Sequence, residues 1–452
     1  MKRDAIIREA LGFDDVLLVP AEANIKPQDV SVKTRLTKTI ALNIPLVSAA
    51  RADVTESVMA IAMAQLGGIG VIHGDMPLGK QVEEVRRVKR SQGDIVSNPI
   101  TISADASVAE AFDLMTTYKV SGLPVIEQAT QKVVGIITHR DIRFFEDYAK
   151  PVSLLMTKEV ITVKGKPEKS VALRMLHEHR IEKLVLVDDQ GRCTGLITVK
   201  DVEKLSRYPD AARDEHGRLR VGAAVGTGKD ALDRAAAMAD AGLDVVFVDV
   251  AHGHTRDAVG TVSTIRQQRT TAAQVVAGNV STGAAARSMI DAGADAIKVG
   301  VGGVSCAHGR RRLGVGMPQI TALLDVVAQC VLADVPVIVE GGIVDAATLA
   351  KALAAGAESA VLTRALAGAD EAPGEIVIHE GRPYKTLLVN RSAPRDVFKV
   401  EKDAVGNDAP YLGNAQHIVN SLVTGLKSAM AYAGGKDMAS LRENAQFVRV
   451  KE

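Results

Sequence analysis

The apolar positions of this chain form short continuous runs that alternate with stretches of helical spacing. Continuous aliphatic runs are typical of strands buried on both faces, and a 3.6-residue spacing is typical of the helices that cover them. Eight parallel strands with intervening helices predict an α/β fold, the (β/α)8 TIM barrel. The predicted strands are residues 44–49, 69–72, 221–225, 245–249, 274–277, 296–299, 335–339 and 359–362.

An internal repeat separates the second predicted strand from the third. Residues 100–142 and 161–202 both follow the pattern β-α-β-β-α. One such unit is too small to bury its sheet alone, so the pair is expected to share a hydrophobic face. We therefore predict three segments, which are the first part of the barrel at 1–93, an inserted repeat pair at 94–206 (94–150 and 151–206), and the second part of the barrel with a C-terminal helix at 207–452.

Each repeat ends in a Thr-x-x-Asp sequence, from Thr138 to Asp141 and from Thr198 to Asp201. The pair resembles a tandem of cystathionine-β-synthase (CBS) regulatory modules, the Bateman module. The resemblance implies that the Asp accepts hydrogen bonds from a ribose and that the Thr contacts phosphate, with an adenine or guanine nucleotide as the ligand. The residues alone leave a second reading open, in which each Asp only begins a helix as a capping or first-turn residue.

Composition narrows the class of protein. The 452 residues are 47% hydrophobic and 24% charged, with 3% aromatic residues and no Trp, so the core must be aliphatic. A net charge of +1 argues against nucleic acid or an anionic membrane as a partner. No run approaches the ~18 apolar residues of a membrane span, and the three cysteines are too far apart in sequence for a zinc motif. We expect a reducing, cytoplasmic location.

Polar residues gather where the predicted strands end, which is where a TIM barrel carries its reactive groups. After the sixth strand, the segment 300–316 contains several glycines, a lone thiol at Cys306 and three consecutive arginines. A cysteine beside cationic side chains can act as a nucleophile, although an inert thiol in a surface loop has the same local pattern. The residues at the strand ends are Ser48, His73, Asp249, Asn279, Gly300 to Cys306, Glu340 and Arg364.

The barrel, the inserted repeats and the cysteine loop together resemble the IMP dehydrogenase/GMP reductase family. The similarity covers nearly the whole chain. It is carried by LGFDDVLLVP at 11–20, DVAHGHT at 249–255, AGNVST at 277–282, AGADAIKVG at 292–300 and GVGMPQ at 314–319.

This resemblance implies that the Cys306 thiolate attacks C2 of the purine of IMP, that a hydride leaves to NAD, and that water hydrolyses the adduct to XMP. It implies substrate contacts from Ser48, Ser305, Glu340, Gly341, Gly342, Arg364 and Tyr384. It implies cofactor contacts from Asp249, His252, Asn279, Gly300 and Gly302. It also implies a potassium ion on the carbonyls of Gly300, Gly302 and Cys306, and a homotetramer that the repeat pairs can join into an octamer.

The substrate site departs from the family pattern. Arg51 stands where a purine-contacting Met is usual, Glu340 replaces a ribose-binding Asp, and Ala307 replaces a Thr next to the cysteine. The flap reads YKTLLVNRS at 384–392, is shorter than expected, and has no evident Arg-Tyr pair to activate water.

Three interpretations follow. The chain is a divergent IMP dehydrogenase, a GMP reductase-like nucleotide oxidoreductase that needs no hydrolytic pair, or a catalytically impaired paralogue that acts as a nucleotide-sensing scaffold. The inserted repeats favour the dehydrogenase.

Overall fold

The computed structural model describes residues 8–91, 96–97, 99–118, 120–165, 167–199, 207–268, 273–301, 313–387 and 408–450. The chain divides into two compact units. One comprises residues 1–91, 210–214 and 219–452, and the other comprises residues 92–209 and 215–218. Each unit is described by itself.

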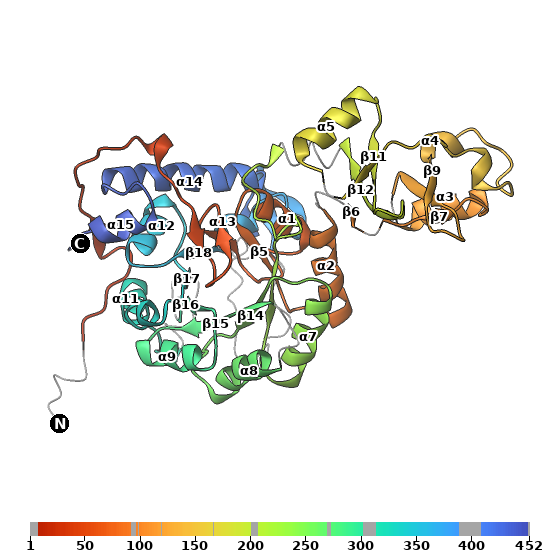
Figure 1. Cartoon of the computed structure of the whole chain (residues 1–452). Coiled ribbons are helices and arrows are strands. Elements are labelled where there is room, and N and C mark those ends of the chain that lie inside the picture. Colours follow the sequence, from red (N-terminus) through yellow and green to blue (C-terminus); the bar gives the residue numbers. More distant parts are fainter. Residues whose placement is uncertain are drawn as a thin grey trace. The chain divides into compact units, whose positions relative to one another are not determined.

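The first unit is a closed barrel of parallel strands, as the hydrophobic pattern predicted (Figure 1). Around the barrel the order is β13-β14-β15-β16-β17-β18-β4-β5. The strands are β4 (Leu46–Ser48), β5 (Ile69–Ile72), β13 (Gly222–Val225), β14 (Val245–Asp249), β15 (Gln274–Val280), β16 (Ala296–Val299), β17 (Val337–Glu340) and β18 (Ser359–Leu362).

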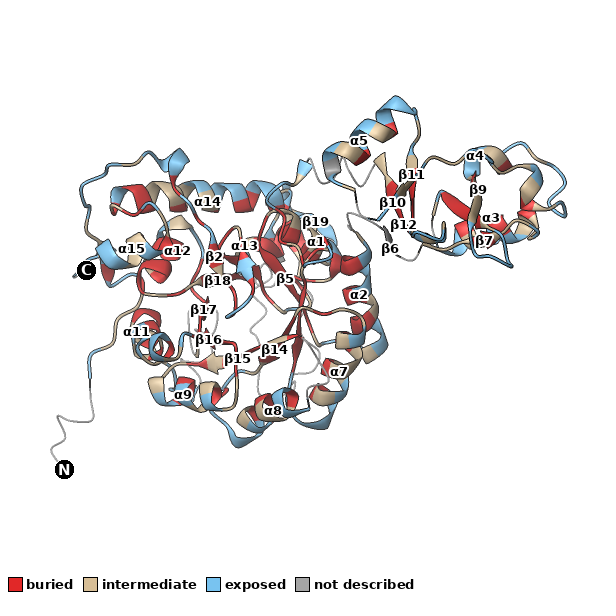
Figure 2. Cartoon of the chain, in the orientation of Figure 1, coloured by how far each residue is buried: buried red, intermediate tan, exposed pale blue. Residues whose placement is uncertain are grey.

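The barrel strands are almost wholly buried, and the helices around them expose only their outer faces (Figure 2). This burial explains why the strands read as continuous aliphatic runs and not as alternating patterns. The helices are α1 (Ser57–Gln65), α2 (Leu78–Ser91), α7 (Gly228–Asp240), α8 (Arg256–Gln267), α9 (Gly283–Asp291), α11 (Gln319–Cys330), α12 (Ala346–Ala354), α13 (Arg364–Ala367), α14 (Ala415–Tyr432) and α15 (Met438–Asn444).

Side-chain caps fix where several of these helices begin. Thr255 accepts a hydrogen bond from the backbone of Ala258 at the start of α8, and Thr282 caps α9 in the same way through Ala285. Caps of this type satisfy backbone N–H groups that have no partner within the helix. They place the helix starts directly after the strand-end loops, and this holds those loops at one rim of the barrel.

Besides the short antiparallel pair of β2 (Thr34–Arg35) and β3 (Ala41–Leu42), the described part of the first unit has two smaller sheets. Near the chain termini, β1 (Val16–Leu18) pairs antiparallel with β22 (Phe447–Arg449). After the last barrel strand, β19 (Ile376–His379), β20 (Arg382–Thr386) and β21 (Asp408–Pro410) form a three-stranded antiparallel sheet. Neither sheet was among the predicted elements, because these strands are short and half-exposed and carry no long aliphatic run.

The second unit contains the repeat, and both copies follow the predicted element order as far as the structure describes them. The first copy has β7 (Ile102–Ser103), α3 (Val108–Tyr118), β8 (Gly122–Ile126), β9 (Val133–Thr138) and α4 (His139–Ile142). The second has β10 (Thr162–Lys164), α5 (Lys169–Glu178), β11 (Lys183–Val187) and β12 (Cys193–Thr198). In both, the first and second strands pair parallel and the second and third pair antiparallel.

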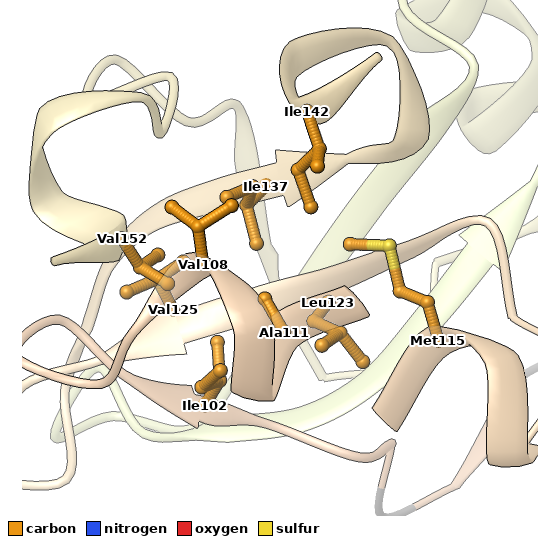
Figure 3. Close-up of a cluster of buried hydrophobic side chains, with 9 residues drawn as sticks. All are labelled: Ile102, Val108, Ala111, Met115, Leu123, Val125, Ile137, Ile142 and Val152. Atoms are coloured by element: carbon orange, nitrogen blue, oxygen red, sulfur yellow. The ribbon is translucent and has the colours of Figure 1, made fainter. Parts of the chain in front are cut away.

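Each copy has its own core, and a third cluster joins the two copies. Figure 3 shows the core of the first copy, in which Val108, Ala111 and Met115 of α3 pack onto strand residues such as Val125 and Ile137. The joining cluster is built from Val185, Val187 and Leu196 of the second copy, with Val133, Ile136, Val160 and Cys193 against them. The two copies therefore share an apolar face, which is what a tandem of small sheets requires.

Among the described residues, no helix is both long enough and apolar enough to span a bilayer.

Candidate functional site

The predicted site residues that the structure describes in the barrel lie mostly at the carboxyl ends of its strands. Ser48 ends β4, Asp249 ends β14 and Glu340 ends β17, while Asn279 is the penultimate residue of β15 and Gly300 follows β16. All strands of a parallel barrel point the same way, so these residues share one rim. Gly302, Ser305, Cys306 and Arg391, together with Asp201 of the second repeat, lie outside the described residues.

A buried lysine holds two carboxylates at this rim. The Nζ atom of Lys298, on β16, lies 2.7 Å from Oδ1 of Asp249 and also donates a hydrogen bond to Oε2 of Glu340. The side chain of Lys298 is 3% exposed, whereas those of Asp249 and Glu340 are 22% and 20% exposed. The two carboxylates are thus anchored from below by one cation and keep part of their surface open to a ligand.

The charges of this cluster depend on one another. Burial opposes the charged form of Lys298, but the attraction of Asp249 and Glu340 outweighs it and raises the pKa of the lysine above its usual value. For Glu340, burial also opposes ionisation, yet Lys298, Asn279 and the charge of Arg51 together lower its pKa. Burial, joined by repulsion from Glu340, raises the pKa of Asp249 despite the attraction of Lys298.

Asn279 links the end of β15 to its neighbours. Its Nδ2 atom donates to Oε2 of Glu340 at 2.9 Å and to the carbonyl of Gly300 at 3.2 Å. Its Oδ1 atom is buried and has no hydrogen-bond partner among the described residues. A buried amide oxygen without a donor is costly, so it marks a position where a bound group with a donor would be stabilised. The peptide bond between Gly278 and Asn279 is cis.

The segment that carries Cys306 leaves the barrel at Gly300 and returns before α11. The backbone N–H of Met317 donates to the carbonyl of Val301 at 3.1 Å, which closes the base of the loop. Gln319, the first residue of α11, donates to the carbonyls of Glu340 at 2.6 Å and Gly341 at 3.3 Å. Both ends of the cysteine segment are therefore fixed beside the carboxylate cluster.

Gly300 is required where it stands. It adopts a φ of +155°, and a Cβ atom there would lie 2.1 Å from the carbonyl oxygen of Glu340. Any residue with a Cβ atom would clash with this carbonyl oxygen. Only glycine therefore lets the chain that follows β16 pass so close to the end of β17.

Arg51 and Ser48 follow β4. Arg51 forms two hydrogen bonds with the buried carboxylate of Asp53, Nε to Oδ1 at 2.9 Å and one terminal nitrogen to Oδ2 at 2.7 Å, and its side chain is 53% exposed. Ser48 is fully buried, and its Oγ accepts a hydrogen bond from Thr55 at 2.9 Å. Arg51 is held along its own loop by Asp53, and its positive charge reaches Glu340.

His73 and His252 occupy different surroundings. His73 directly follows β5 and is buried, and its Nδ1 atom accepts a hydrogen bond from the backbone of Asp75. His252 is exposed in the loop after β14, where its ring packs edge to face against His254 with 6.5 Å between centroids. An exposed aromatic ring in the loop that follows Asp249 is a suitable surface for a planar ligand group.

Arg364 and Tyr384 belong to elements that follow the last barrel strand. Arg364 is the exposed first residue of α13, one residue beyond Thr363 at the end of the barrel strand β18. Tyr384 belongs to β20 of the three-stranded sheet, pairs with Pro410, and packs its ring edge on to His379. The family resemblance implied substrate contacts from both residues, and the structure places only Arg364 at the end of a barrel strand.

In the first repeat, the predicted nucleotide motif is occupied by an intramolecular cap. A carboxylate oxygen of Asp141 accepts hydrogen bonds from the backbone N–H of Thr138 and from its hydroxyl, both at 2.7 Å. Asp141 therefore lies in the first turn of α4 and holds the start of this helix, while its contact with a nucleotide stays a prediction. Thr198 ends β12 in the corresponding position of the second repeat.

Sequence reasoning missed three residues that organise the site, which are Lys298, Gln319 and Asp53. Lys298 carried a usable signal, because a charged residue in the middle of an otherwise aliphatic barrel strand needs a buried counter-ion. Gln319 and Asp53 carried no such signal. Gln319 binds carbonyl groups that are distant in the sequence, and Asp53 lies in an irregular loop.

A model of the IMP dehydrogenase / GMP reductase domain matches residues 10–452. The chain belongs to the IMP dehydrogenase/GMP reductase family. Among curated members, it is 45% identical over 460 residues to the inosine-5'-monophosphate dehydrogenase of Aquifex aeolicus, covering 98% of this chain and 94% of that protein. It is 43% identical to the enzyme of the same name from Bacillus subtilis, covering 98% of this chain and 93% of that protein.

Solved structures of the family include GMP reductase. A variant GMP reductase from Trypanosoma brucei in complex with guanosine 5'-monophosphate superposes with a TM-score of 0.87 at 32% identity, covering 100% of this chain and 97% of that one. The same reductase in complex with guanosine 5'-triphosphate gives a TM-score of 0.83 and covers 100% of both chains. Because a reductase matches this chain over its full length, the inserted repeats do not by themselves distinguish the two branches of the family.

Proposed function

We propose that this protein is an NAD-dependent IMP dehydrogenase, which oxidises IMP to XMP through a covalent cysteine adduct. The observation that carries the proposal is the carboxylate cluster at the barrel rim, where Asp249 and Glu340 stand on either side of Lys298. Two partly open carboxyl groups suit two ribose diols, because an ionised carboxylate can accept hydrogen bonds from vicinal hydroxyls. The identity of 45% and 43% to curated dehydrogenases supports this branch over the other.

In this assignment Glu340 binds the ribose of IMP and Asp249 the ribose of NAD, with Asn279 between them. Ser48, Gly341 and Gly342 surround the substrate, Arg364 and Ser305 meet its phosphate, and Tyr384 belongs to the flap over it. His252, Gly300 and Gly302 contact the cofactor. The Oδ1 atom of Asn279, which has no partner among the described residues, supports a ligand with a hydrogen-bond donor at this point, such as a carboxamide.

Cys306 is the proposed nucleophile. The other two cysteines are poor candidates, since burial raises the pKa of the Cys330 thiol to about 12 and also raises that of Cys193. A thiolate bond to C2 of the purine creates a tetrahedral carbon, and loss of hydride from that carbon restores a planar adduct. Water then replaces sulfur at C2, which yields XMP and returns the thiol. NAD, when bound, accepts the hydride.

The family resemblance also implies a potassium ion bound to the carbonyls of Gly300, Gly302 and Cys306. Only the Gly300 carbonyl lies among the described residues, and it already accepts a hydrogen bond from Asn279. The described residues thus offer no built cation site here, and no step of the reaction is derived through the ion.

The experiment is turnover of the purified protein with IMP and NAD, and separately with GMP and NADPH, followed by the absorbance of the reduced cofactor. We expect NADH formation in the first assay, its loss in Cys306→Ala and its retention in the matched variant Cys330→Ala. NADPH consumption with GMP alone would establish the reductase, the second candidate, which the full-length match to a GMP reductase supports. No turnover in either assay would favour the third interpretation, a nucleotide-sensing scaffold with impaired catalysis.

We also propose that the second unit is a tandem CBS module, residues 94–206, that binds an adenine or guanine nucleotide. Its paired sheets and shared apolar cluster support the module. In the first repeat, one oxygen of Asp141 already accepts two hydrogen bonds from Thr138. A ribose would therefore bind to the remaining acceptor sites of this carboxylate. Calorimetric titration with ATP and with GTP tests this, and Asp141→Ala and Asp201→Ala are each expected to weaken binding.

A homotetramer is proposed for the barrel. Exposed apolar side chains on and after α11 support a subunit contact there, since Leu324, Val331 and Leu332 are 50%, 71% and 78% exposed. Light scattering after size-exclusion chromatography measures the assembly, with and without nucleotide, because an octamer is expected only through the repeat pairs.

A further inference from the structure

Lys298 is the residue on which both ribose-binding carboxylates depend. Its ammonium group bonds Oδ1 of Asp249 at 2.7 Å and Oε2 of Glu340, and it is 3% exposed, so solvent does not compete for it. The three residues sit on neighbouring parts of the barrel, because β16 carries Lys298 while Glu340 ends the adjacent β17 and Asp249 ends β14. No motif in the family resemblance assigned it a role.

We propose that Lys298 is a positioning residue that orients the two carboxylates together and so couples the binding of substrate and cofactor. This inference rests on the proposed function, because it takes Glu340 and Asp249 as the acceptors for the two ribose groups. One cation shared by two carboxylates transmits a change at either of them to the other. A ligand that binds Glu340 and shifts its carboxylate changes how strongly the ammonium group of Lys298 can hydrogen-bond to Asp249.

The electrostatics of the cluster agree with this role. The attraction of Lys298 lowers the pKa of Glu340 and offsets part of the burial that raises the pKa of Asp249. Removing the cation would leave two carboxylates close together without compensation, and one of them would take up a proton. A protonated carboxyl group carries an O–H donor on one oxygen and is a weaker acceptor, so it binds the two hydroxyls of a diol less well than a carboxylate does.

The start of the Lys298 side chain is closely packed against β15. A Cβ atom on Gly278 would lie 2.6 Å from the carbonyl oxygen of Lys298 and 2.7 Å from its Cβ, so β15 and β16 are already in close contact. Arginine is a planar, larger donor that does not substitute for a compact ammonium group in such a space. We therefore expect Lys298→Arg to fail to restore what Lys298→Met loses.

The chain supplies a matched control in Lys89. This lysine of α2 is 5% exposed, lies 3.1 Å from Oδ2 of Asp214 and also pairs with Asp244. Asp244 directly precedes β14 and Asp249 ends it, so the same strand has a lysine-bound carboxylate near each end. The Lys89 cluster lies before the strand and away from the rim where the strands end, so it shares the burial and charge of the Lys298 cluster but not its position.

The test compares Lys298→Met, Lys298→Arg and Lys89→Met by melting temperature, kcat, KM for IMP and KM for NAD. We expect both lysine-to-methionine variants to melt at lower temperature. Only Lys298→Met should raise both KM values, by about tenfold or more, the amount that loss of a charge-assisted hydrogen bond corresponds to. The acidic limb of its kcat/KM profile should move to higher pH, because its carboxylates protonate more readily.

A cross-measurement tests the coupling itself. In the wild-type background, Glu340→Gln should raise the KM for NAD as well as that for IMP, and this effect on NAD should vanish when Lys298→Met is already present. KM values that are unchanged in Lys298→Met, or that rise equally in Lys89→Met, would overturn the proposal. If the wild type turns over neither nucleotide pair, the proposed function fails, and calorimetric binding of IMP and NAD to the same variants decides the role of Lys298 separately.

Discussion

The Nδ2 atom of Asn279 lies 2.9 Å from Oε2 of Glu340, and this bond crosses the end of β16 to join β15 to β17. It shows how the chain accommodates a glutamate where the family resemblance led us to expect an aspartate. The additional methylene extends the carboxylate by roughly 1.5 Å, the length of one carbon–carbon bond. The longer side chain reaches the amide of Asn279 and the ammonium of Lys298 together.

Substrate binding should therefore depend more on the negative charge of residue 340 than on the length of its side chain. We expect Glu340→Gln to raise the KM for IMP by about tenfold or more, because it removes charge-assisted bonds worth ~1.5–3 kcal/mol. Glu340→Asp keeps the charge and should change the KM by only a few-fold. Steady-state kinetics with IMP varied measures both, and equal effects of the two substitutions would contradict this account.

Gly300 offers a test of backbone geometry at the rim. A Cβ there would meet the carbonyl of Glu340 at 2.1 Å, so Gly300→Ala must displace β16 from β17 and should lower kcat/KM by about a hundredfold, as small misplacements in an active site do. Gly226, which follows β13, is the control, because a Cβ atom at that position would meet no atom within 4 Å. Similar activities of Gly300→Ala and Gly226→Ala would show that the close approach is not needed.

A buried ion pair ties the C-terminal helix α15 to the barrel. Arg442 binds both carboxylate oxygens of Glu358, at 3.0 and 2.8 Å, and the two side chains are only 26% and 12% exposed. Arg442→Met removes two charge-assisted hydrogen bonds and leaves the Glu358 carboxylate with Arg35 and Thr34, so it should destabilise the first unit by ~2 kcal/mol. Adding Glu358→Gln should recover part of that loss. Urea denaturation measures the three variants, and strictly additive effects would refute the coupling.

His73 predicts a pH dependence of stability. Burial lowers the pKa of His73, although the nearby carboxylate of Glu56, 3.7 Å from Nε2, acts in the opposite direction. The unfolded chain then binds the proton more readily than the folded one, so stability is lost as pH falls below ~6.5 towards the lower pKa of the folded state. Melting temperatures between pH 7.5 and 5 should fall less steeply for His73→Gln than for the wild type. Equal slopes would show that another group is responsible.

The sheet of the barrel could be read from the chain because its strands are buried on both faces. Such strands must be continuously aliphatic, and the residues 245–249 and 296–299 were placed to the residue. The start of β15 at Gln274 was also placed correctly, but its end was not, since the strand continues through Gly278, Asn279 and Val280, where polar and small residues hide the pattern. The sheet of β19, β20 and β21 was missed because its side chains are largely exposed and carry no apolar period.

The candidate site could be located but not assembled from the chain. Strand order and the rule for parallel barrels were enough to gather Asp249, Asn279 and Glu340 at one rim. Their mutual bonds were beyond reach, because a hydrogen bond between residues 61 positions apart depends on how adjacent strands stagger and on which rotamer each side chain adopts. The pairing of Arg51 with Asp53 also emerged only from the fold. The two residues are close in sequence, but they lie in an irregular loop whose conformation no local pattern predicts.

The amino-acid sequence alone thus defines the barrel, the inserted repeat and the family, since each depends on patterns that are local or that recur along the chain. The tertiary structure decides how charge is shared at the rim. Burial makes the state of Lys298 depend on Asp249 and Glu340, and their states depend on it. That dependence arises from distance and from exclusion of water, and neither is written in the order of the residues.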